Sequence, residues 1–126
     1  MLVVDASSIA RKFLLLRLQS LGYQVHVAED GERALAMIEA RAYAIVFLEL
    51  ALGPKDGIDG LRLCQAIKHK PDHPNGVVPA VVVVTGRVGS TDRVRGALAG
   101  CDAYLTKPLI KEELIMVMGE VDPLFN

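Results

Sequence analysis

Apolar and polar residues alternate along this chain in two rhythms. Short apolar runs, many of them β-branched, have the length of strands and fall at residues 2–5, 24–28, 44–49, 80–85 and 103–106. Between these runs apolar residues recur at helical spacing, which predicts helices at residues 8–21, after Asp30, at 61–68, at 91–99 and at 111–120. Strict alternation of the two patterns predicts five βα units and a parallel sheet.

The apolar content of each run predicts its place in the sheet. The runs at 2–5, 44–49 and 80–85 are the most hydrophobic, as is typical of central strands covered on both faces. In the run at 24–28, Val25 and Val27 alternate with polar residues, which favours an edge strand. Right-handed crossovers place helices on both faces of such a sheet, so we expect an α/β fold of three layers, an α/β/α sandwich.

Capping signals bound the first two helices. Ser7 or Ser8 can cap the helix at 8–21 because a serine hydroxyl accepts from a free backbone amide, and Gly22 can end it. Asp30 can cap the next helix in the same way.

Length and composition predict a single domain over residues 1–126. The chain has 126 residues, enough for one substantial core. Its hydrophobic fraction of 52% is high, but apolar runs such as 42–48 and 77–84 are far too short to cross a bilayer. A net charge of -1, with Lys and Arg scattered along the chain, gives no electrostatic reason to expect direct nucleic-acid binding.

The cysteines and histidines show no metal-binding spacing. Cys64 and Cys101 form neither a CxxC pair nor a zinc knuckle, so we interpret both as small buried or half-buried thiols. The three histidines are spread over a strand and a loop and are assigned no chemistry. The sequence enters a strand at once without a signal or transit peptide, which makes a cytoplasmic location the expectation.

Four of the predicted strands lead into polar residues. These are Asp5, Glu49, Thr85 and Lys107. In an open parallel sheet, ligands and chemistry gather at the carboxyl ends of the strands. The sequence therefore predicts that these four side chains converge on one site.

Several short motifs match a known family in order and spacing. They are Leu2-Val-Val-Asp5, Asp59-Gly60-Leu61, Val83-Val-Thr85-Gly86 and Gly100-Cys-Asp-Ala-Tyr-Leu-Thr-Lys-Pro108. Together they resemble the receiver domain of bacterial two-component response regulators over essentially the whole chain. The resemblance implies a flavodoxin-like sheet of order 2-1-3-4-5. It also implies that a histidine kinase donates a phosphoryl group to an aspartate at the end of the third strand, assisted by a divalent ion.

The resemblance assigns roles to five residues. Asp5 matches the first acidic residue of the metal site, Thr85 the switch hydroxyl, Lys107 the lysine that binds phosphoryl oxygens, and Tyr104 the aromatic switch residue. Pro108 matches a proline that follows a cis peptide bond in the family.

Two positions depart from the family pattern. Ala6 replaces the second acidic residue, and Glu49 stands at the phosphoacceptor position. Mg²⁺ would be left with Asp5, Glu49 and the backbone carbonyl of Ala51, so we expect weak metal binding and no cofactor otherwise. The glutamate carboxylate also reaches about 1.5 Å further than that of aspartate. We therefore expect a degenerate, or pseudo-, receiver that is not phosphorylated efficiently.

Glu49 has two interpretations that the sequence leaves open. Its carboxylate could lie toward Lys107 and Thr85 and imitate part of the charge of an aspartyl phosphate, or the pair could be a plain ion pair in a vestigial pocket. In the first case the chain is a non-enzymatic signalling module. It would act on protein partners through the face formed by the helix at 91–99, the strand at 103–106 and the helix at 111–120.

The expected partners are a histidine kinase, a phosphotransfer protein or an effector domain, and a homodimer is possible. No membrane partner is expected. Leu15 and Leu16 lie where the family often has polar residues; an exposed apolar surface there would be a partner or dimer contact, although we favour leucines half covered by neighbours.

Two alternatives remain. One is a receiver that is still phosphorylated, on Glu49 or on a neighbouring residue. The other is a small phosphate- or flavin-binding protein that holds an anion at Asp5-Ala-Ser-Ser8, although this loop lacks glycine. Hydrolytic enzymes are disfavoured because the chain has neither a G-x-S-x-G nor an H-E-x-x-H motif.

Overall fold

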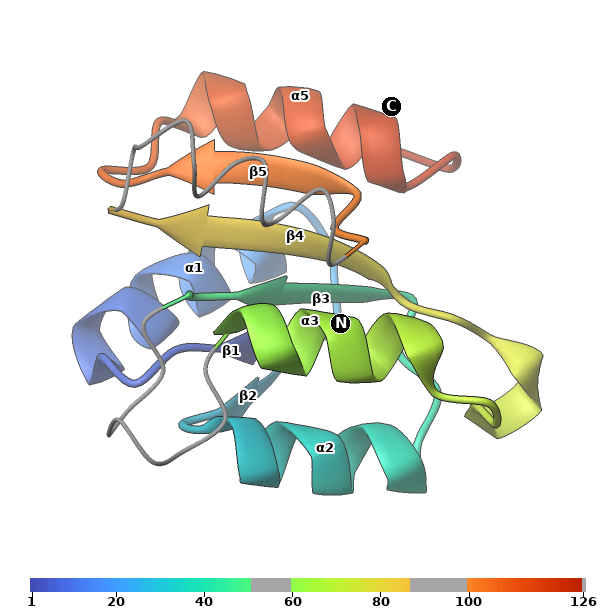
Figure 1. Cartoon of the computed structure of the whole chain (residues 1–126). Helices are drawn as coiled ribbons and strands as arrows, with labels where there is room; N and C mark the ends of the chain where they lie inside the picture. Colours follow the sequence, from blue (N-terminus) through green and yellow to red (C-terminus); the bar gives the residue numbers. More distant parts are fainter. Residues whose placement is uncertain (51–59, 87–99, 126) are drawn as a thin grey trace.

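A computed structural model describes residues 1–50, 60–86 and 100–125. Its sheet contains five parallel strands in the order β2-β1-β3-β4-β5 (Figure 1). The strands are β1 (Leu2–Val4), β2 (His26–Ala28), β3 (Ile45–Leu48), β4 (Ala80–Thr85) and β5 (Ala103–Thr106). This strand order confirms the predicted α/β fold. It also confirms the predicted edge position of β2 and the predicted central positions of β1, β3 and β4.

The described helices agree with the predicted ones to within a few residues. They are α1 (Ser8–Ser20), α2 (Gly31–Ala40), α3 (Gly60–His69) and α5 (Lys111–Val121), with a short 3-10 helix at Pro74–Gly76. The helix predicted at 91–99 lies outside the described residues.

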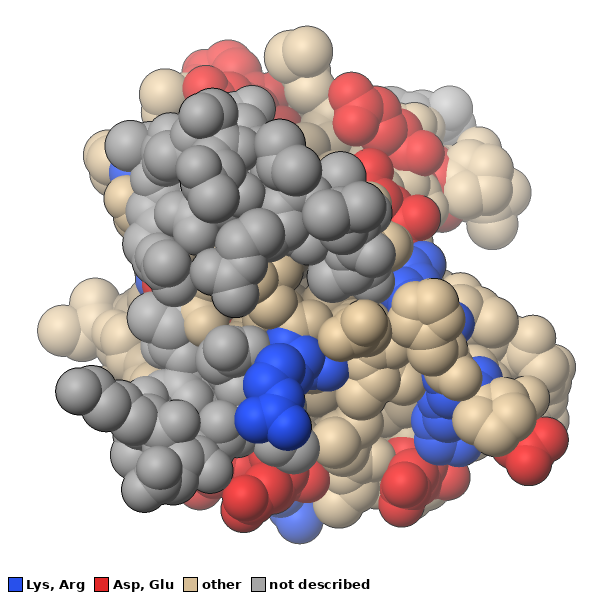
Figure 2. All heavy atoms as spheres, viewed as in Figure 1, with Lys and Arg blue, Asp and Glu red and all other residues tan. Residues whose placement is uncertain are grey.

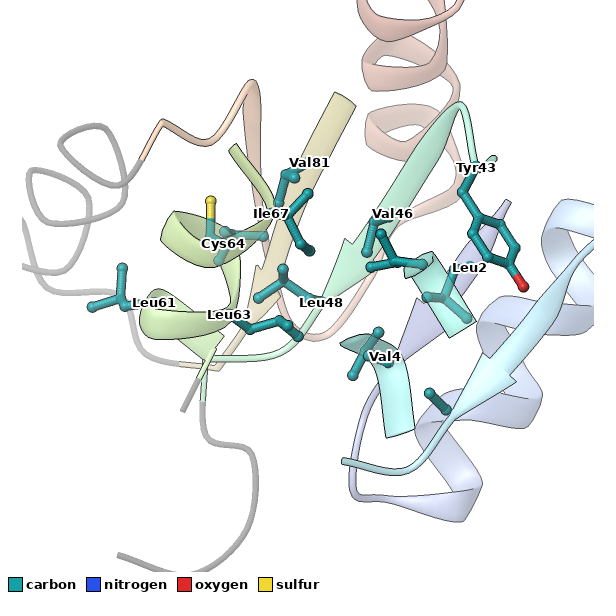
Figure 3. Close-up of a cluster of buried hydrophobic side chains, with 14 of the residues drawn as sticks. Leu2, Val4, Tyr43, Val46, Leu48, Leu61, Leu63, Cys64, Ile67 and Val81 are labelled. Atoms are coloured by element: carbon teal, nitrogen blue, oxygen red, sulfur yellow. The ribbon is translucent and has the colours of Figure 1, made fainter. Parts of the chain in front are cut away.

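The core has two halves, one on each face of the sheet. On one face α2 and α3 bury residues against alternate strand positions such as Val46 and Val81 (Figure 3). On the other face α1 and α5 cover the intervening positions, including Phe47 and Val82. Because successive strand residues point to opposite faces, each central strand contributes to both halves, which explains its continuous apolar sequence.

The predicted caps of the first two helices are present. The Ser7 hydroxyl accepts from the Ala10 amide at 3.2 Å, and an Asp30 carboxylate oxygen accepts from the Arg33 amide at 2.8 Å. Gly22 follows the end of α1 with φ of +95°, a conformation that side chains other than glycine rarely adopt.

Three strands are shorter than predicted. The ladder between β1 and β2 begins at the pair Leu2 and His26, so the two residues before His26 lie outside the ladder. β1 and β3 both stop one residue earlier than predicted, which places Asp5 and Glu49 just beyond the ends of their strands.

The surface matches the expectations from charge but not all of those from hydropathy. Acidic and basic side chains are interspersed on the face that carries α2 and α3 (Figure 2). Among the described residues, no helix combines the length and the apolar character needed to cross a membrane.

The prediction of half-covered leucines on α1 is correct for Leu15 and wrong for Leu16. The exposure of Leu16 is 54%, because it lies on the outer side of α1.

The two cysteines are buried and partly buried, as predicted. Cys64 on α3 has no exposed surface, and Cys101, just before β5, packs against the same half of the core. Figure 3 shows the Cys64 side chain among the buried residues of this half.

Candidate functional site

The structure brings Asp5, Glu49, Thr85 and Lys107 together at the carboxyl edge of the sheet. Asp5 and Glu49 follow β1 and β3, Thr85 is the last residue of β4, and Lys107 follows β5. The register of the parallel strands causes this convergence, because Val4 pairs with Leu48 and Thr85 pairs with Thr106. The site therefore depends on contacts between residues as much as 102 positions apart in the sequence.

Lys107 lies between two carboxylates but not at equal distances. Its ammonium donates to Asp5 Oδ2 at 2.8 Å, whereas Glu49 Oε2 is 3.7 Å away. The Asp5 and Glu49 side chains are 10% and 11% exposed, and that of Lys107 is 29% exposed. Two largely buried carboxylates thus share one ammonium, which makes these three side chains net negative.

Glu49 extends into the site. The Thr85 hydroxyl donates to Glu49 Oε1 at 3.1 Å, and Thr85 has no exposed surface. The Glu49 backbone amide donates to the Val4 carbonyl at 3.0 Å, which fixes the start of the side chain beside β1. The carboxylate consequently lies near both the Thr85 hydroxyl, which the resemblance assigns to the switch, and the Lys107 ammonium, which it assigns to phosphoryl binding.

Asp5 is held through both its side chain and its backbone carbonyl. Its Oδ1 accepts from the Ser7 amide at 2.9 Å, and its Oδ2 accepts from Lys107. Arg11 donates to the Asp5 carbonyl at 2.7 Å and to the Ala6 carbonyl at 3.2 Å. Sequence reasoning missed Arg11, since nothing in the pattern of α1 distinguishes it from the other basic residues of that helix.

Gly60 positions the backbone that carries Glu49. A Cβ atom added at Gly60 would lie 2.2 Å from the Glu49 carbonyl oxygen and 2.5 Å from Leu50 Cα. The Gly60 amide donates to the Leu50 carbonyl at 2.9 Å. Only glycine permits this approach of α3 to the end of β3. Sequence analysis noted Gly60 as part of a motif but did not assign it this role.

Tyr104 and Pro108 lie on the β5 side of the site. Tyr104 is partly buried, pairs with Val83 across the ladder and packs against the core half formed with α2 and α3. The peptide bond between Lys107 and Pro108 is cis, which is the isomer that the resemblance implies.

A cavity of about 510 Å³ borders the site. Asp5, Glu49 and Lys107 line its polar part, and side chains of α1, including Ile9 and Phe13, line its apolar part. The cavity therefore makes the carboxylates accessible from the side of α1.

The described residues fit a divalent cation poorly. Asp5 and Glu49 offer oxygen ligands of the type that Mg²⁺ prefers. However, both carboxylate oxygens of Asp5 already accept from nitrogen donors, and Ala6 supplies no side-chain ligand. The third candidate ligand, the carbonyl of Ala51, lies outside the described residues. Within those residues, no cluster of three or more His, Cys, Asp or Glu is arranged to hold a metal.

Comparisons with known proteins point to one family. A family model described as the response regulator receiver domain matches residues 1–118. The chain is 36% identical over 117 residues to the response regulator MprA of Mycolicibacterium vanbaalenii, covering 93% of this chain and 47% of the relative. It is 32% identical over 125 residues to the heme response regulator HssR of Staphylococcus aureus, covering 99% of this chain and 52% of the relative.

A solved structure supports the fold. The chemotaxis protein CheY4 of Vibrio cholerae matches with a TM-score of 0.83 at 23% sequence identity, covering 95% of each chain. The present chain spans about half the length of the curated relatives that it matches. The match of the family model over nearly the whole chain, together with this fold, shows that the chain belongs to the response regulator receiver domain family of two-component systems.

Proposed function

We propose that this chain is a non-enzymatic receiver domain in which Glu49 permanently occupies the place of a transient phosphoryl group. The observation that carries the proposal is the position of its carboxylate, which accepts from the Thr85 hydroxyl at 3.1 Å and lies 3.7 Å from the Lys107 ammonium. A carboxylate placed there stabilises one arrangement of the switch residues Thr85 and Tyr104 without phosphorylation.

The imitation of a phosphoryl group is partial. A phosphoryl group carries a charge of about -1.5 to -2 and three acceptor oxygens, whereas a carboxylate carries about -1 and two. One charge-assisted hydrogen bond contributes about 1.5 to 3 kcal/mol. Reversing a 1:99 equilibrium requires about 5.5 kcal/mol. Glu49 therefore shifts the switch equilibrium by one to two orders of magnitude but leaves it responsive to a binding partner.

Phosphorylation is inefficient for two separate reasons. The Glu49 carboxylate is displaced by about 1.5 Å relative to an aspartate, and a misplacement of about 1 Å can cost a hundredfold in rate. Charge neutralisation by a metal is also weakened, because Ala6 supplies no ligand and Asp5 is occupied by Ser7 and Lys107.

The switch test compares the parent protein with Glu49→Asp and Glu49→Gln. The chemical shifts of the Thr85 and Tyr104 amides report the arrangement of the switch. Glu49→Gln retains an oxygen that can accept from Thr85 but removes the charge, so we expect both amides to move away from their parent positions. Glu49→Asp should move them as well, since its shorter side chain withdraws from both partners. If the three proteins have the same shifts and the same partner affinity, Glu49 is an inert ion pair.

The phosphorylation test uses intact mass after incubation with acetyl phosphate and Mg²⁺. We expect no adduct on the parent protein. The double variant Ala6→Asp/Glu49→Asp should gain about 80 Da, the mass of one phosphoryl group. An adduct of this mass on the parent protein would instead favour a receiver that is still phosphorylated.

The proposed output surface includes β5 and α5. A groove beside these elements is lined by Tyr104, Thr106, Glu113, Met116 and Glu120, among others. Tyr104 is therefore both a switch residue and part of the lining of this groove. A change in the position of the Thr85 side chain reaches the surface through Tyr104. The third component of this face, the helix predicted at 91–99, lies outside the described residues. Suitable partners are an effector domain, a histidine kinase or a phosphotransfer protein.

A further inference from the structure

The cavity beside the site extends well beyond its polar side chains. Its volume of about 510 Å³ lies within the range of about 300–1,000 Å³ that is typical of small-molecule sites. Most of the remaining lining is apolar and comes from α1, from β1, β3 and β4 and from the loop after β5. It includes Val3, Ile9, Phe13, Leu14, Phe47 and Leu109. The cavity thus joins a small polar end to a larger apolar part.

The apolar part has a packed floor and an open mouth. Leu14 and Phe47 belong to the core half that α1 and α5 cover, and they are 4% and 1% exposed. Ile9 and Phe13, by contrast, are 82% and 42% exposed. Removing such apolar surface from water is favourable, and an apolar cavity holds water poorly. The cavity is therefore suited to an apolar group that enters past Ile9 and Phe13.

The polar end is rich in hydrogen-bond acceptors. Asp5 and Glu49 line it and are, as whole residues, 7% and 9% exposed. One oxygen of Asp5 accepts from the Ser7 amide and the other from the Lys107 ammonium. Because each carboxylate oxygen has two acceptor sites, Asp5 can accept further hydrogen bonds from a ligand. A head group that donates hydrogen bonds is thus complementary to this end.

The charges at the polar end select the sign of that head group. Among the described residues that line the cavity, Asp5 and Glu49 are acidic and Lys107 is basic. An anionic head group would lie beside two nearly buried carboxylates. An ammonium group would instead give two carboxylates and two ammonium groups, and its hydrogen bonds to the carboxylates would be charge-assisted.

We propose that this cavity binds a small amphiphile with one primary ammonium group and an apolar body of about eight carbons. The ammonium group lies against Asp5 and Glu49, and the apolar body lies between α1 and the sheet. Such a ligand contacts the carboxylate that also accepts from Thr85, so it gives the receiver an input other than phosphorylation. That consequence rests on the proposed function of Glu49, whereas the binding itself does not.

Three ligands with a similar body and different head groups test the site. They are phenethylamine, phenethyl alcohol and phenylacetate, each titrated into the protein while NMR follows the amides of Ile9, Ala10 and Leu109. We expect phenethylamine to bind with a Kd of about 1 mM, the alcohol about tenfold more weakly and phenylacetate more weakly still. The preference for the amine should decrease with salt, because screening weakens its attraction to the carboxylates.

Two results of this titration overturn the proposal. One is the absence of saturable shifts at these amides up to about 20 mM phenethylamine. The other is equal affinity for the three ligands, which would show that Asp5 and Glu49 do not select a cation.

Ala10→Leu tests whether the ligand occupies the cavity. Ala10 lines the cavity from α1 and is partly buried, so a leucine there fills part of the space. We expect phenethylamine and phenethyl alcohol each to lose at least about tenfold in affinity. Ala36→Leu on α2 is the matched control, since Ala36 is exposed and does not line the cavity. Unchanged affinity in Ala10→Leu would overturn the proposal.

Glu49→Gln tests the polar end separately from the apolar part. Phenethylamine should bind about tenfold more weakly, whereas phenethyl alcohol should keep its affinity within about twofold. Glu39→Gln removes the same charge from the exposed side of α2 and should change neither affinity. An equal loss in both variants would show that bulk charge, and not the cavity, attracts the amine. The Thr85 and Tyr104 amides of the ligand-free variants report the switch, so absence of amine binding and absence of a switch are distinguishable.

Discussion

The arrangement of two carboxylates around one ammonium predicts an asymmetry in stability. Lys107→Met removes the ammonium that both Asp5 and Glu49 contact, and both side chains are nearly buried. Removal of one partner from a buried ion pair typically costs about 3–5 kcal/mol. Since the Lys107 side chain is 29% exposed, we expect the lower end of that range, about 3 kcal/mol.

Glu49→Gln should have a much smaller effect. With an effective dielectric constant of about 20, attraction to Lys107 is about 6 kcal/mol for Asp5 at 2.8 Å and about 4 kcal/mol for Glu49 at 3.7 Å. The substitution removes the weaker attraction, but it also removes the desolvation cost of a second carboxylate and its repulsion from Asp5. The amide oxygen can still accept from Thr85. We therefore expect a change in the free energy of unfolding within about 1 kcal/mol.

Urea unfolding followed by circular dichroism measures both effects, provided that the m-values remain equal. Asp5→Asn is the matched comparison, because it removes the carboxylate in direct contact with Lys107, and it should cost more than Glu49→Gln. A cost above about 2 kcal/mol for Glu49→Gln, or below about 1 kcal/mol for Lys107→Met, would refute the view that Asp5 and Glu49 share Lys107 unequally.

Three further predictions concern residues around the site and the core. Gly60→Ala should cost about 3 kcal/mol in urea unfolding, because its Cβ would lie 2.2 Å from the Glu49 carbonyl oxygen. Gly86→Ala is the control, since a Cβ there meets no atom of the described residues within 4 Å, and equal costs would contradict the reasoning. Burial, followed by the nearby Cys101, raises the pKa of the Cys64 thiol to about 12. The unfolded chain therefore releases this proton first as pH rises, so stability should fall between about pH 9 and pH 12, by at most about 1.4 kcal/mol per pH unit. Cys64→Ala should flatten that part of the stability curve, and an unchanged curve would exclude Cys64 as its cause. The Tyr23 hydroxyl donates to Asp122 at 2.5 Å and is the main cause that lowers the pKa of that carboxyl. Tyr23→Phe should raise the Asp122 pKa toward its ordinary value in an NMR titration, and no change would show that the amide of Leu124 is sufficient to lower it.

The outer side of α1 illustrates where reasoning from sequence alone fails. Leu15 and Leu16 are neighbours of the same type, and their pattern cannot tell which of them the sheet covers. Helix orientation, set by the burial of Leu14 and Leu18, leaves Leu16 outward. Arg11 and Gly60 were not predicted to be positioning residues, because their contacts with the backbone of Asp5 and of Glu49 follow from how α1 and α3 are placed and leave no local pattern in the sequence.

The sequence by itself determined the alternation of strands and helices, the central and edge strands, and the convergence of Asp5, Glu49, Thr85 and Lys107. These properties follow from local periodicity and from the rule that parallel strands end at one edge of their sheet. The tertiary structure decided that Lys107 binds Asp5 more closely than Glu49, and that Glu49 accepts from Thr85. Such distances depend on strand register and on the packing of α1 and α3 against the sheet, which are long-range properties that no local pattern encodes.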